Sequence, residues 1–331
     1  MGVIKEYIKK SSLFKIPYGL YRKTRQYFYD RKNSEKKIKK IFGDEKDKTI
    51  YIIRRFHKAG FFSNFFFVLG HIIYADKNGW VPVVDMENYS TLYNETYNIN
   101  NTRNAWEYYF VQPGAVRLNK AYKYKNQVLS SGYYLYDNVP YYEGKERSFP
   151  TREKVAFLSG YVDKYIKINQ NILDEADSIR QKWDGLVIGV HIRGTDMKCT
   201  PDHPIPPQVL QFIDEIDKLM CIVDISHICV CTDEKAVLEQ MIKKYGDKIV
   251  CTNSYRSTDG KSIHKSHSDN GRKDHHYLMG KEVLIDAIVL SKCDYLICGH
   301  SNVAYAAIVF NDNKYMDVKL LENEEQDKNM R

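Results

Sequence analysis

Polar side chains that could bind a phosphate group stand at the end of the apolar run 186–192. His191 lies within that run and Arg193 follows it directly. A guanidinium group can bind two oxygens of one phosphate, and Gly194 beside it lets a ligand approach the backbone. These residue types at this spacing indicate a site for a phosphate or diphosphate, with a structural ion pair between Arg193 and Asp233 as the alternative.

A second polar group follows the apolar run 294–298, in the order Gly, His, Ser, Asn. Ser301 and Asn302 stand where a helix is expected to begin, and the free N–H groups at the start of a helix bind anions. We therefore expect Arg193 and this helix start to hold one diphosphate between them. Taken alone, Ser301 and Asn302 are ordinary helix-capping residues.

Asp286 stands on the apolar segment 276–292, four residues after Glu282 and therefore on the same face of a helix. Two carboxylates on an otherwise apolar helix cost stability unless they are solvated or paired. Either they form an exposed stripe, or Asp286 accepts hydrogen bonds from a ligand such as the edge of a nucleobase.

The polar segment 253–275 predicts a functional or disordered loop, since loops of this length are uncommon in compact domains. Four histidines lie in or beside it, but their spacing matches no helix-borne zinc pattern, so we predict no metal site. We favour a lid that brings Arg256 or Arg272 to the phosphates.

The elements that must position these residues alternate between strand and helix. Strands are predicted at 186–192, 227–232, 248–252, 294–298 and 314–320, with helices at about 206–221, 234–245, 276–292 and about 301–310. This order is typical of a doubly wound parallel sheet, whose ligands collect at the carboxyl ends of the strands. Thr232 and Asp233 end the second of these strands, so we expect them at the same edge.

The first half of the chain predicts a second α/β unit. A strand at 49–55, a helix at 65–79 and a strand at 80–85 form a β-α-β pattern, while 86–150 predicts irregular connections with short elements. A long helix is expected from Thr151, its N-cap, to about Trp183. The predicted fold is therefore α/β, with two Rossmann-like parallel-sheet domains facing a cleft. The expected divisions are an arm over 1–48, a first α/β domain over 49–180 and a second over 181–331.

The net charge of +8 is confined to the amino-terminal arm. Residues 1–48 hold 15 Lys and Arg against 6 Asp and Glu, so the remainder of the chain is nearly neutral. This distribution disfavours nucleic acid as a partner. The arm mixes basic and apolar residues, as would an interfacial helix resting on anionic lipid. A solvated helix packed on the body is the alternative.

Several other signals bear on location and chemistry. No apolar run is long enough to span a bilayer, and the first residues lack a secretory signal. Seven cysteines without paired C-x-x-C motifs predict reduced thiols. We expect a cytoplasmic protein, peripheral on the inner face of the membrane through residues 1–45. The absence of G-x-x-x-x-G-K-S/T and G-x-G-x-x-G disfavours P-loop hydrolysis and ordinary dinucleotide binding.

The motifs "GVHIRGTD", "CTDE", "SDN" and "GKEVLIDAIVLSKCDYLICGHSNVAYAAIVFN" resemble those of the fucosyltransferase superfamily. This superfamily groups core α1,6-fucosyltransferases, nodulation fucosyltransferases and protein O-fucosyltransferases. The resemblance covers residues 186–312 and extends loosely to the first half through "AGFFSNFFFVLGHIIYADKNGWVPVVD". It implies a GT-B glycosyltransferase that is inverting and metal-independent and takes a nucleotide sugar, typically GDP-fucose. The domain over 49–180 would then be the acceptor side, and the domain over 181–331 would bind the nucleotide sugar.

The resemblance also implies roles for particular residues. His191 and Arg193 would contact the donor diphosphate, Asp286 would read the guanine, and Ser301 and Asn302 would line the phosphate end. Thr232 and Asp233 would face the nucleotide or support the fold. The sequence departs from the core α1,6 pattern after the first motif, where Met197 takes the basic position, Lys198 comes one position late and no glutamate follows in the expected place. The general base is therefore open between Asp196 and Asp202.

The sequence predicts transfer of fucose from GDP-fucose to a hydroxyl of a bacterial surface glycan, with a glycan or lipid-linked oligosaccharide as acceptor. One alternative is a glycosyltransferase of the same fold that takes another nucleotide sugar. The other is a non-catalytic module that binds a nucleotide sugar or glycan, which the missing glutamate would suit.

Overall fold

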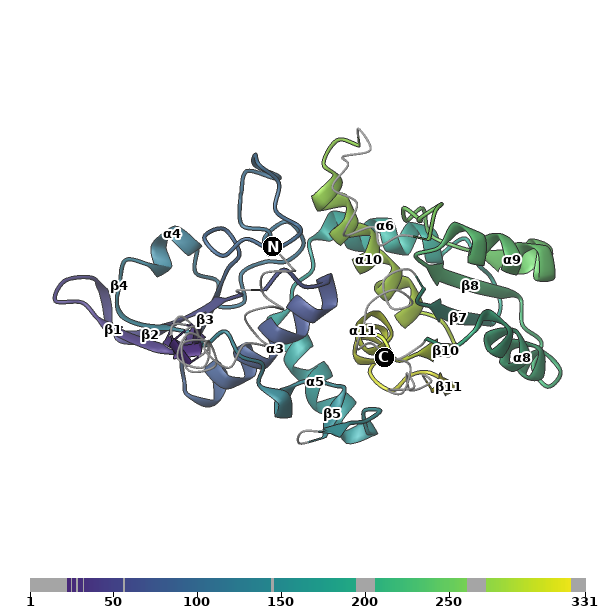
Figure 1. Ribbon diagram of the computed structural model, residues 1–331, viewed down its shortest axis with the longest axis horizontal. Helices are drawn as coiled ribbons and strands as arrows, with labels where there is room; N and C mark the ends of the chain where they lie inside the picture. The colour runs from purple at the N-terminus through teal and green to yellow at the C-terminus, as the bar shows by residue number, and fades with distance from the viewer. Residues whose placement is uncertain are drawn as a thin grey trace, which may run out of the picture.

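The computed structural model describes residues 23–24, 26–27, 29–31, 33–55, 57–143, 146–194, 206–260 and 272–322. Two larger sheets, one in each half of the chain, lie at opposite ends of the molecule (Figure 1). Helices α3, α5, α10 and α11 lie between them. The fold is therefore the predicted α/β, GT-B-like pairing of two units built on parallel strands.

The first sheet contains the predicted β-α-β unit. It has the order β1-β4-β2-β3 and is formed by β1 (Lys36–Lys39), β2 (Asp44–Arg54), β3 (Val81–Asp85) and β4 (Tyr124–Leu129). Strand β2 runs parallel to both β3 and β4, and β1 is antiparallel to β4. Helix α3 (Phe61–Lys77) connects β2 to β3 and begins four residues before the predicted start. Most of its residues are buried, which explains why its sequence is apolar on nearly every face.

Strand β4 is one of the short elements that the sequence predicted for 86–150. The sequence of β4, YKNQVL, lacks the apolar alternation that marks a strand. Gln127 is nevertheless buried, and its amide donates hydrogen bonds to the carbonyls of Tyr122 and Tyr124 at 3.1 and 2.7 Å. The other elements of this region are short: α4 (Leu118–Ala121), the 3₁₀ turn η2 (Tyr136–Asn138), β5 (Tyr142–Glu143) and β6 (Glu146–Arg147).

The amino-terminal arm is not one helix. Residues 1–22 lie outside the described part, but β1 and the start of β2 show that the end of the arm is extended. Within residues 29–33, the Tyr29 hydroxyl lies 3.0 Å from His57 Nε2, and Asn33 is fully buried. This part of the arm packs on the body, which is the alternative that the sequence left open.

The second sheet matches the prediction closely. It has the order β11-β10-β7-β8-β9, and all its strands are parallel. The strands are β7 (Val187–Ile192), β8 (His227–Thr232), β9 (Ile249–Val250), β10 (Tyr295–Gly299) and β11 (Asp317–Leu321). The helices are α8 (Val209–Met220), α9 (Lys235–Tyr245), α10 (His275–Ser291) and α11 (Asn302–Asn311). The chain proceeds from β7 outward to β9 and then returns to β10 on the other side of β7, so the topological switch point lies between β7 and β10.

The single long helix predicted from Thr151 to Trp183 is wrong. It is divided into α5 (Arg152–Tyr165) and α6 (Gln170–Arg180). The predicted N-cap is confirmed, since Thr151 Oγ1 accepts a hydrogen bond from the Lys154 amide at 3.2 Å. The break is held from outside the segment, because the Asn169 amide donates to the carbonyls of Glu107 and Tyr108, both at 3.1 Å.

An aromatic core joins the two halves. Phe62 and Phe65 of α3 lie 6.1 and 5.6 Å from Phe310 of α11, measured between ring centroids. The domain boundary predicted at residue 180 falls at the end of α6 and stays a prediction, as does the cleft. Among the helices of the described part, none is long and apolar enough to cross a membrane.

Candidate functional site

The switch point of the second sheet brings two of the predicted site segments together. Strands β7 and β10 are hydrogen-bonded neighbours, with His191 opposite Cys298. The carboxyl end of β7 leads to Arg193, and that of β10 leads to Ser301 at the start of α11. In open α/β sheets, ligands bind at this position, between strands whose connections leave in opposite directions.

His191 and Ser301 are in direct contact. His191 Nδ1 lies 3.1 Å from Ser301 Oγ, which also accepts a hydrogen bond from the Ala304 amide at 3.1 Å. The serine proton is therefore available to His191 Nδ1, an arrangement that places the ring proton on Nε2. Burial, together with the charge of Arg193, lowers the pKa of His191 to about 4. The imidazole is thus neutral near pH 7, with an N–H group to donate.

Arg193 and Asp233 form the ion pair that the sequence offered as the alternative reading. Arg193 Nη1 lies 3.5 Å from Asp233 Oδ2, and the Gly194 amide donates to Asp233 Oδ1 at 3.0 Å. The Arg193 side chain keeps 24% of its surface exposed. Asp233 therefore orients the guanidinium group and the turn after β7, while part of that group still faces solvent.

Glu234 is a neighbour of this cluster to which the sequence assigned no role. A Cβ atom on Gly194 would fall 1.8 Å from Glu234 Oε1, so the carboxylate occupies the space that a side chain at Gly194 would need. The Glu234 amide in turn donates to Thr232 Oγ1 at 3.3 Å. Thr232 thus supports the turn after β8. The signal for Glu234 was its position two residues after a buried strand.

Asp286 is buried, which rules out the exposed stripe. Its Oδ1 atom accepts hydrogen bonds from the hydroxyls of Thr252 and Ser254, the latter at 2.8 Å. Burial raises the pKa of Asp286 above its ordinary value, against the effect of these two hydroxyls. Thr252 and Ser254 lie at the end of the predicted strand 248–252, but sequence reasoning did not connect them to Asp286.

The two arginines of the predicted lid are engaged by the protein itself. Arg256 donates to the carbonyls of Ser254 and Thr252 at 2.9 and 3.0 Å. Arg272 forms an ion pair with Glu282. Residues 261–271 lie outside the described part of the chain, so the lid stays a prediction.

The remaining predicted site residues are Asp196, Asp202 and Asn302. Asp196 and Asp202 both fall in 195–205, outside the described residues. Asn302 is the first residue of α11, directly after the Ser301 N-cap. Within the described ranges, no group of three or more His, Cys, Asp or Glu side chains is arranged to hold a metal ion.

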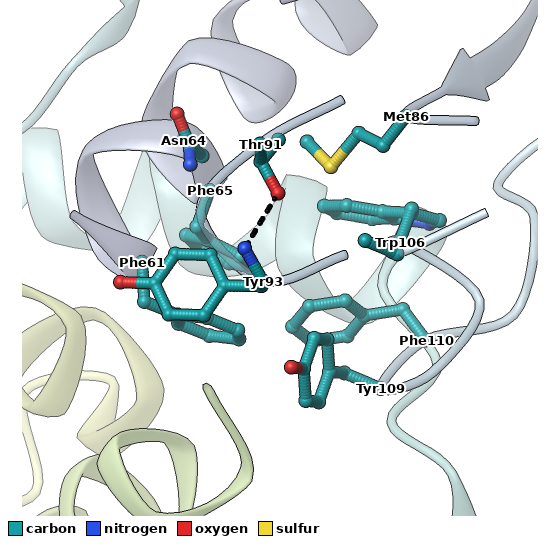
Figure 2. A pocket seen from close by; sticks show the side chains of 10 residues that line it. Phe61, Asn64, Phe65, Met86, Thr91, Tyr93, Trp106, Tyr109 and Phe110 are labelled. Atoms are coloured by element: carbon teal, nitrogen blue, oxygen red, sulfur yellow. Dashed lines mark hydrogen bonds between the residues drawn. The ribbon is translucent and has the colours of Figure 1, made fainter. Parts of the chain in front are cut away.

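A hollow with aromatic walls lies in the first unit, at the start of α3 and the end of β3 (Figure 2). It is lined by Phe61, Asn64, Phe65, Met86, Thr91, Tyr93, Ala105, Trp106, Tyr109 and Phe110. Asn64 and Thr91 supply polar groups, and Asn64 Oδ1 accepts from Arg55 Nε at 3.0 Å. The sequence did not predict this hollow. All the residues that line it are at most 8% exposed, and the volume open to a water molecule is about 20 Å³, so it is a small void in the aromatic core and has no room for a sugar.

The first unit also holds the start of helix α10. The carboxylate of Glu95 accepts a hydrogen bond from the Tyr277 amide at 3.1 Å, and the Tyr97 hydroxyl donates to Asp274 at 2.6 Å. The Tyr109 hydroxyl, beside the aromatic hollow, donates to the Tyr277 carbonyl at 2.9 Å. Helix α10 therefore connects the hollow to the surroundings of Asp286.

The two parallel-sheet units and the polar cluster at the switch point define an α/β protein of GT-B type. Residues 151–309, which contain that cluster, match the family model of alpha-(1,6)-fucosyltransferase N- and catalytic domains. The resemblance to the fucosyltransferase superfamily that the motifs predicted is therefore confirmed for this part of the chain. No curated protein matches the sequence.

Three solved structures show a weaker likeness. The fucosyltransferase NodZ from Bradyrhizobium is 14% identical, over 80% of this chain and 93% of its own, with a TM-score of 0.48. POFUT1 in complex with GDP is 8% identical, over 83% and 98%, with a TM-score of 0.48. A mutant of Arabidopsis thaliana FUT1 in complex with GDP is 10% identical, over 86% and 73%, with a TM-score of 0.49. Scores and identities this low carry no weight for function.

Proposed function

We propose that this protein is an inverting glycosyltransferase that moves fucose from GDP-fucose to a hydroxyl of a bacterial surface glycan. The observation that carries the proposal is the contact between His191 and Ser301 at the switch point, beside Arg193, within the segment that matches the family model. This is where a doubly wound sheet binds a phosphorylated ligand.

The residues of this cluster suit the departure of a sugar from a diphosphate. As the bond to the sugar breaks, the sugar becomes oxocarbenium-like and negative charge grows on the leaving phosphate, so fixed donors facing that charge lower the barrier. Arg193 supplies a guanidinium group, His191 supplies Nε2–H, and α11 supplies the amides of its first turn. With these donors the reaction needs no metal ion, and activity should survive chelation of divalent cations.

Asp286 supplies the means of reading the base. Thr252 and Ser254 both donate to Oδ1, which orients the carboxylate and leaves Oδ2 for a ligand. A guanine presents two adjacent N–H donors on its Watson–Crick edge, and a carboxylate accepts from such donors. Uracil and cytosine lack that pair, so this carboxylate would favour GDP.

A carboxylate must also remove the proton of the acceptor hydroxyl. Asp196 and Asp202 are our candidates, because both are carboxylates that follow β7 closely in the sequence. The proton passes to that carboxylate as the acceptor oxygen forms its bond to the anomeric carbon from the face opposite the diphosphate. Attack from that face inverts the anomeric centre.

The acceptor in this proposal is a glycan or lipid-linked oligosaccharide at the inner face of the membrane. We assign the acceptor side to the first unit, residues 49–180. The basic arm, residues 1–45, would hold this cytoplasmic protein on anionic lipid.

Calorimetric binding of GDP, UDP, CDP and dTDP to the wild type and to Arg193→Ala tests the donor site. We expect selective binding of GDP that Arg193→Ala abolishes, while Arg117→Ala, at an exposed arginine of the first unit, leaves it unchanged. Tighter binding of another nucleotide would favour a different nucleotide sugar. Binding of none would remove the basis of the proposal.

A second assay separates the enzyme from a non-catalytic binding module. Glycosyltransferases commonly hydrolyse their donor slowly without an acceptor, so release of fucose from GDP-fucose is the expected result. NMR of the first sugar released gives the configuration at the anomeric carbon and thereby tests inversion. Binding of GDP-fucose without any release of fucose would support the binding module.

A further inference from the structure

Two large apolar side chains project from the turn between β1 and β2. Ile41 and Phe42 keep 83% and 87% of their surface exposed, more than any other large apolar residue of the described chain. The turn lies at the end of the molecule farthest from the second sheet (Figure 1). Exposing an adjacent Ile and Phe at a protruding turn costs solubility without adding to the core, so they require a reason.

Lysines surround this tip, which we define as residues 40–43. Lys39 and Lys40 precede the apolar pair, and Lys40 donates a backbone hydrogen bond to the Lys125 carbonyl at 2.9 Å. The Asp44 amide donates to the Lys123 carbonyl at 3.0 Å, so Lys123 and Lys125 lie against the base of the tip. Three exposed carboxylates follow the tip, Asp44, Glu45 and Asp47, and Glu45 is paired with Lys48 at 2.7 Å. The tip thus combines an apolar point with a rim in which lysines outnumber carboxylates.

Protection of a sheet edge explains only part of this pattern. Strand β1 is the edge of its sheet and all four of its residues are exposed, and lysines on an edge strand prevent pairing with another chain. That function needs the lysines alone. Ile41 and Phe42 lie beyond the strand, where they protect no edge and would promote association. An apolar point with a cationic rim is instead complementary to an anionic bilayer surface.

We propose that the 40–43 tip inserts Ile41 and Phe42 into an anionic lipid surface while the surrounding lysines contact the headgroups. This inference rests on the proposed membrane contact of the arm and assigns it to particular residues. The tip adjoins the amino end of β2, so the carboxyl ends of β2 and β3 at Arg54 and Asp85 would face away from the lipid. Such an orientation suits an acceptor sugar that projects from the membrane.

Co-sedimentation of the full chain with vesicles tests the inference. The vesicles are phosphatidylcholine with or without phosphatidylglycerol, and the variant is Ile41→Ser with Phe42→Ser. We expect the variant to lose binding to anionic vesicles by about tenfold or more, since each side chain loses its apolar burial. A matched control replaces Ile222 and Met316, which are 81% and 62% exposed in the second unit, and should bind as the wild type does.

A second variant tests the charge. Lys39→Gln with Lys123→Gln should weaken binding to anionic vesicles by about fivefold for each lysine removed, and added salt should reduce the difference. Neither substitution should alter GDP affinity, because the tip adjoins β1, at the opposite end of the molecule from β7 (Figure 1). Calorimetry with GDP therefore shows whether each variant is folded and tests the donor site separately.

The outcomes separate the two proposals. Unchanged vesicle binding by the Ile41/Phe42 variant would overturn the tip inference. The contact with lipid would then be assigned to the first part of the arm. Wild-type protein that binds GDP but no anionic vesicle would overturn the membrane contact and leave the donor site standing. Sedimentation velocity compares the oligomeric state of the two proteins. If the wild type were a dimer and the variant a monomer with unchanged vesicle binding, the tip would be a protein interface and the inference would be wrong.

Discussion

His191 Nδ1 and Ser301 Oγ lie 3.1 Å apart, across the boundary between β7 and β10. One serine hydroxyl thus caps helix α11 and engages the imidazole at the end of the neighbouring strand. The sequence offered helix capping as the alternative to a role of Ser301 in the site. The two functions do not exclude each other. The same oxygen serves both, so a change at Ser301 affects stability and ligand binding together.

Ser301→Ala should lower both the free energy of unfolding and the affinity for GDP. Losing an N-cap costs about 1 kcal/mol, and the buried His191 Nδ1 loses its partner, so a total of about 1–3 kcal/mol is expected. Urea unfolding and calorimetry with GDP measure the two effects. Thr151→Ala is the matched control, because Thr151 caps α5 in the same way and stands outside the cluster. Equal GDP affinity in both variants would contradict the site role.

The free energy of unfolding should fall as the pH is lowered from 6.5 towards 4. The pKa values of His191 and His71 are both lowered from 6.5 to about 4, chiefly by burial. In this window the unfolded chain binds protons that the folded chain does not, so unfolding is favoured as pH falls. Near pH 4, each histidine should have lowered the free energy of unfolding by up to about 3 kcal/mol.

Urea unfolding at pH 7 and at about pH 5 checks this dependence. His71 is held by the Tyr51 hydroxyl at 2.8 Å and the Tyr133 carbonyl at 3.1 Å, so His71→Gln keeps a polar side chain in place. That variant should be less stable at pH 7 and less sensitive to pH than the wild type. A variant with the full pH dependence of the wild type would show that His71 does not contribute.

Asp286→Asn should reduce the preference for GDP over UDP by about tenfold to a hundredfold. The expected loss is that of hydrogen bonds to a charged acceptor, about 1.5–3 kcal/mol. The amide of asparagine retains one oxygen for Thr252 and Ser254, so the fold should tolerate the change. Calorimetry with both nucleotides measures the ratio, and Asp247→Asn at an exposed turn serves as the control. A ratio equal to that of the wild type would remove Asp286 from the base site.

The features that were predictable from the sequence depend on local pattern. Strands β7, β8 and β10 are apolar runs that end in polar residues, and His191 and Arg193 could be placed at a sheet edge for that reason alone. The pairing of Asp286 with Thr252 and Ser254 was not predictable, because a contact across more than thirty residues leaves no local signal. The break between α5 and α6 was not predictable for the same reason, because the carbonyls that accept from Asn169 lie far away in the chain.

Gly194→Ala should disturb the turn after β7 through Glu234. The new Cβ would fall 1.8 Å from Oε1 and 2.5 Å from Cδ of Glu234, so the carboxylate must move. Because the carboxylate is the end of a flexible, half-buried side chain, the cost should be at the low end for overpacking, about 1 kcal/mol. Gly160→Ala in α5 is the control, because no atom lies within 4 Å of the added carbon and alanine favours a helix. It should raise the free energy of unfolding slightly.

Adding Glu234→Ala to Gly194→Ala separates steric strain from ligand access. The double variant has room for the methyl group at position 194, so most of the lost stability should return in urea unfolding. If GDP must approach the backbone at Gly194, its affinity should stay low even in the stable double variant. Recovery of GDP binding together with stability would mean that the glycine makes room for Glu234 alone, and that the diphosphate lies elsewhere along the edge of the sheet.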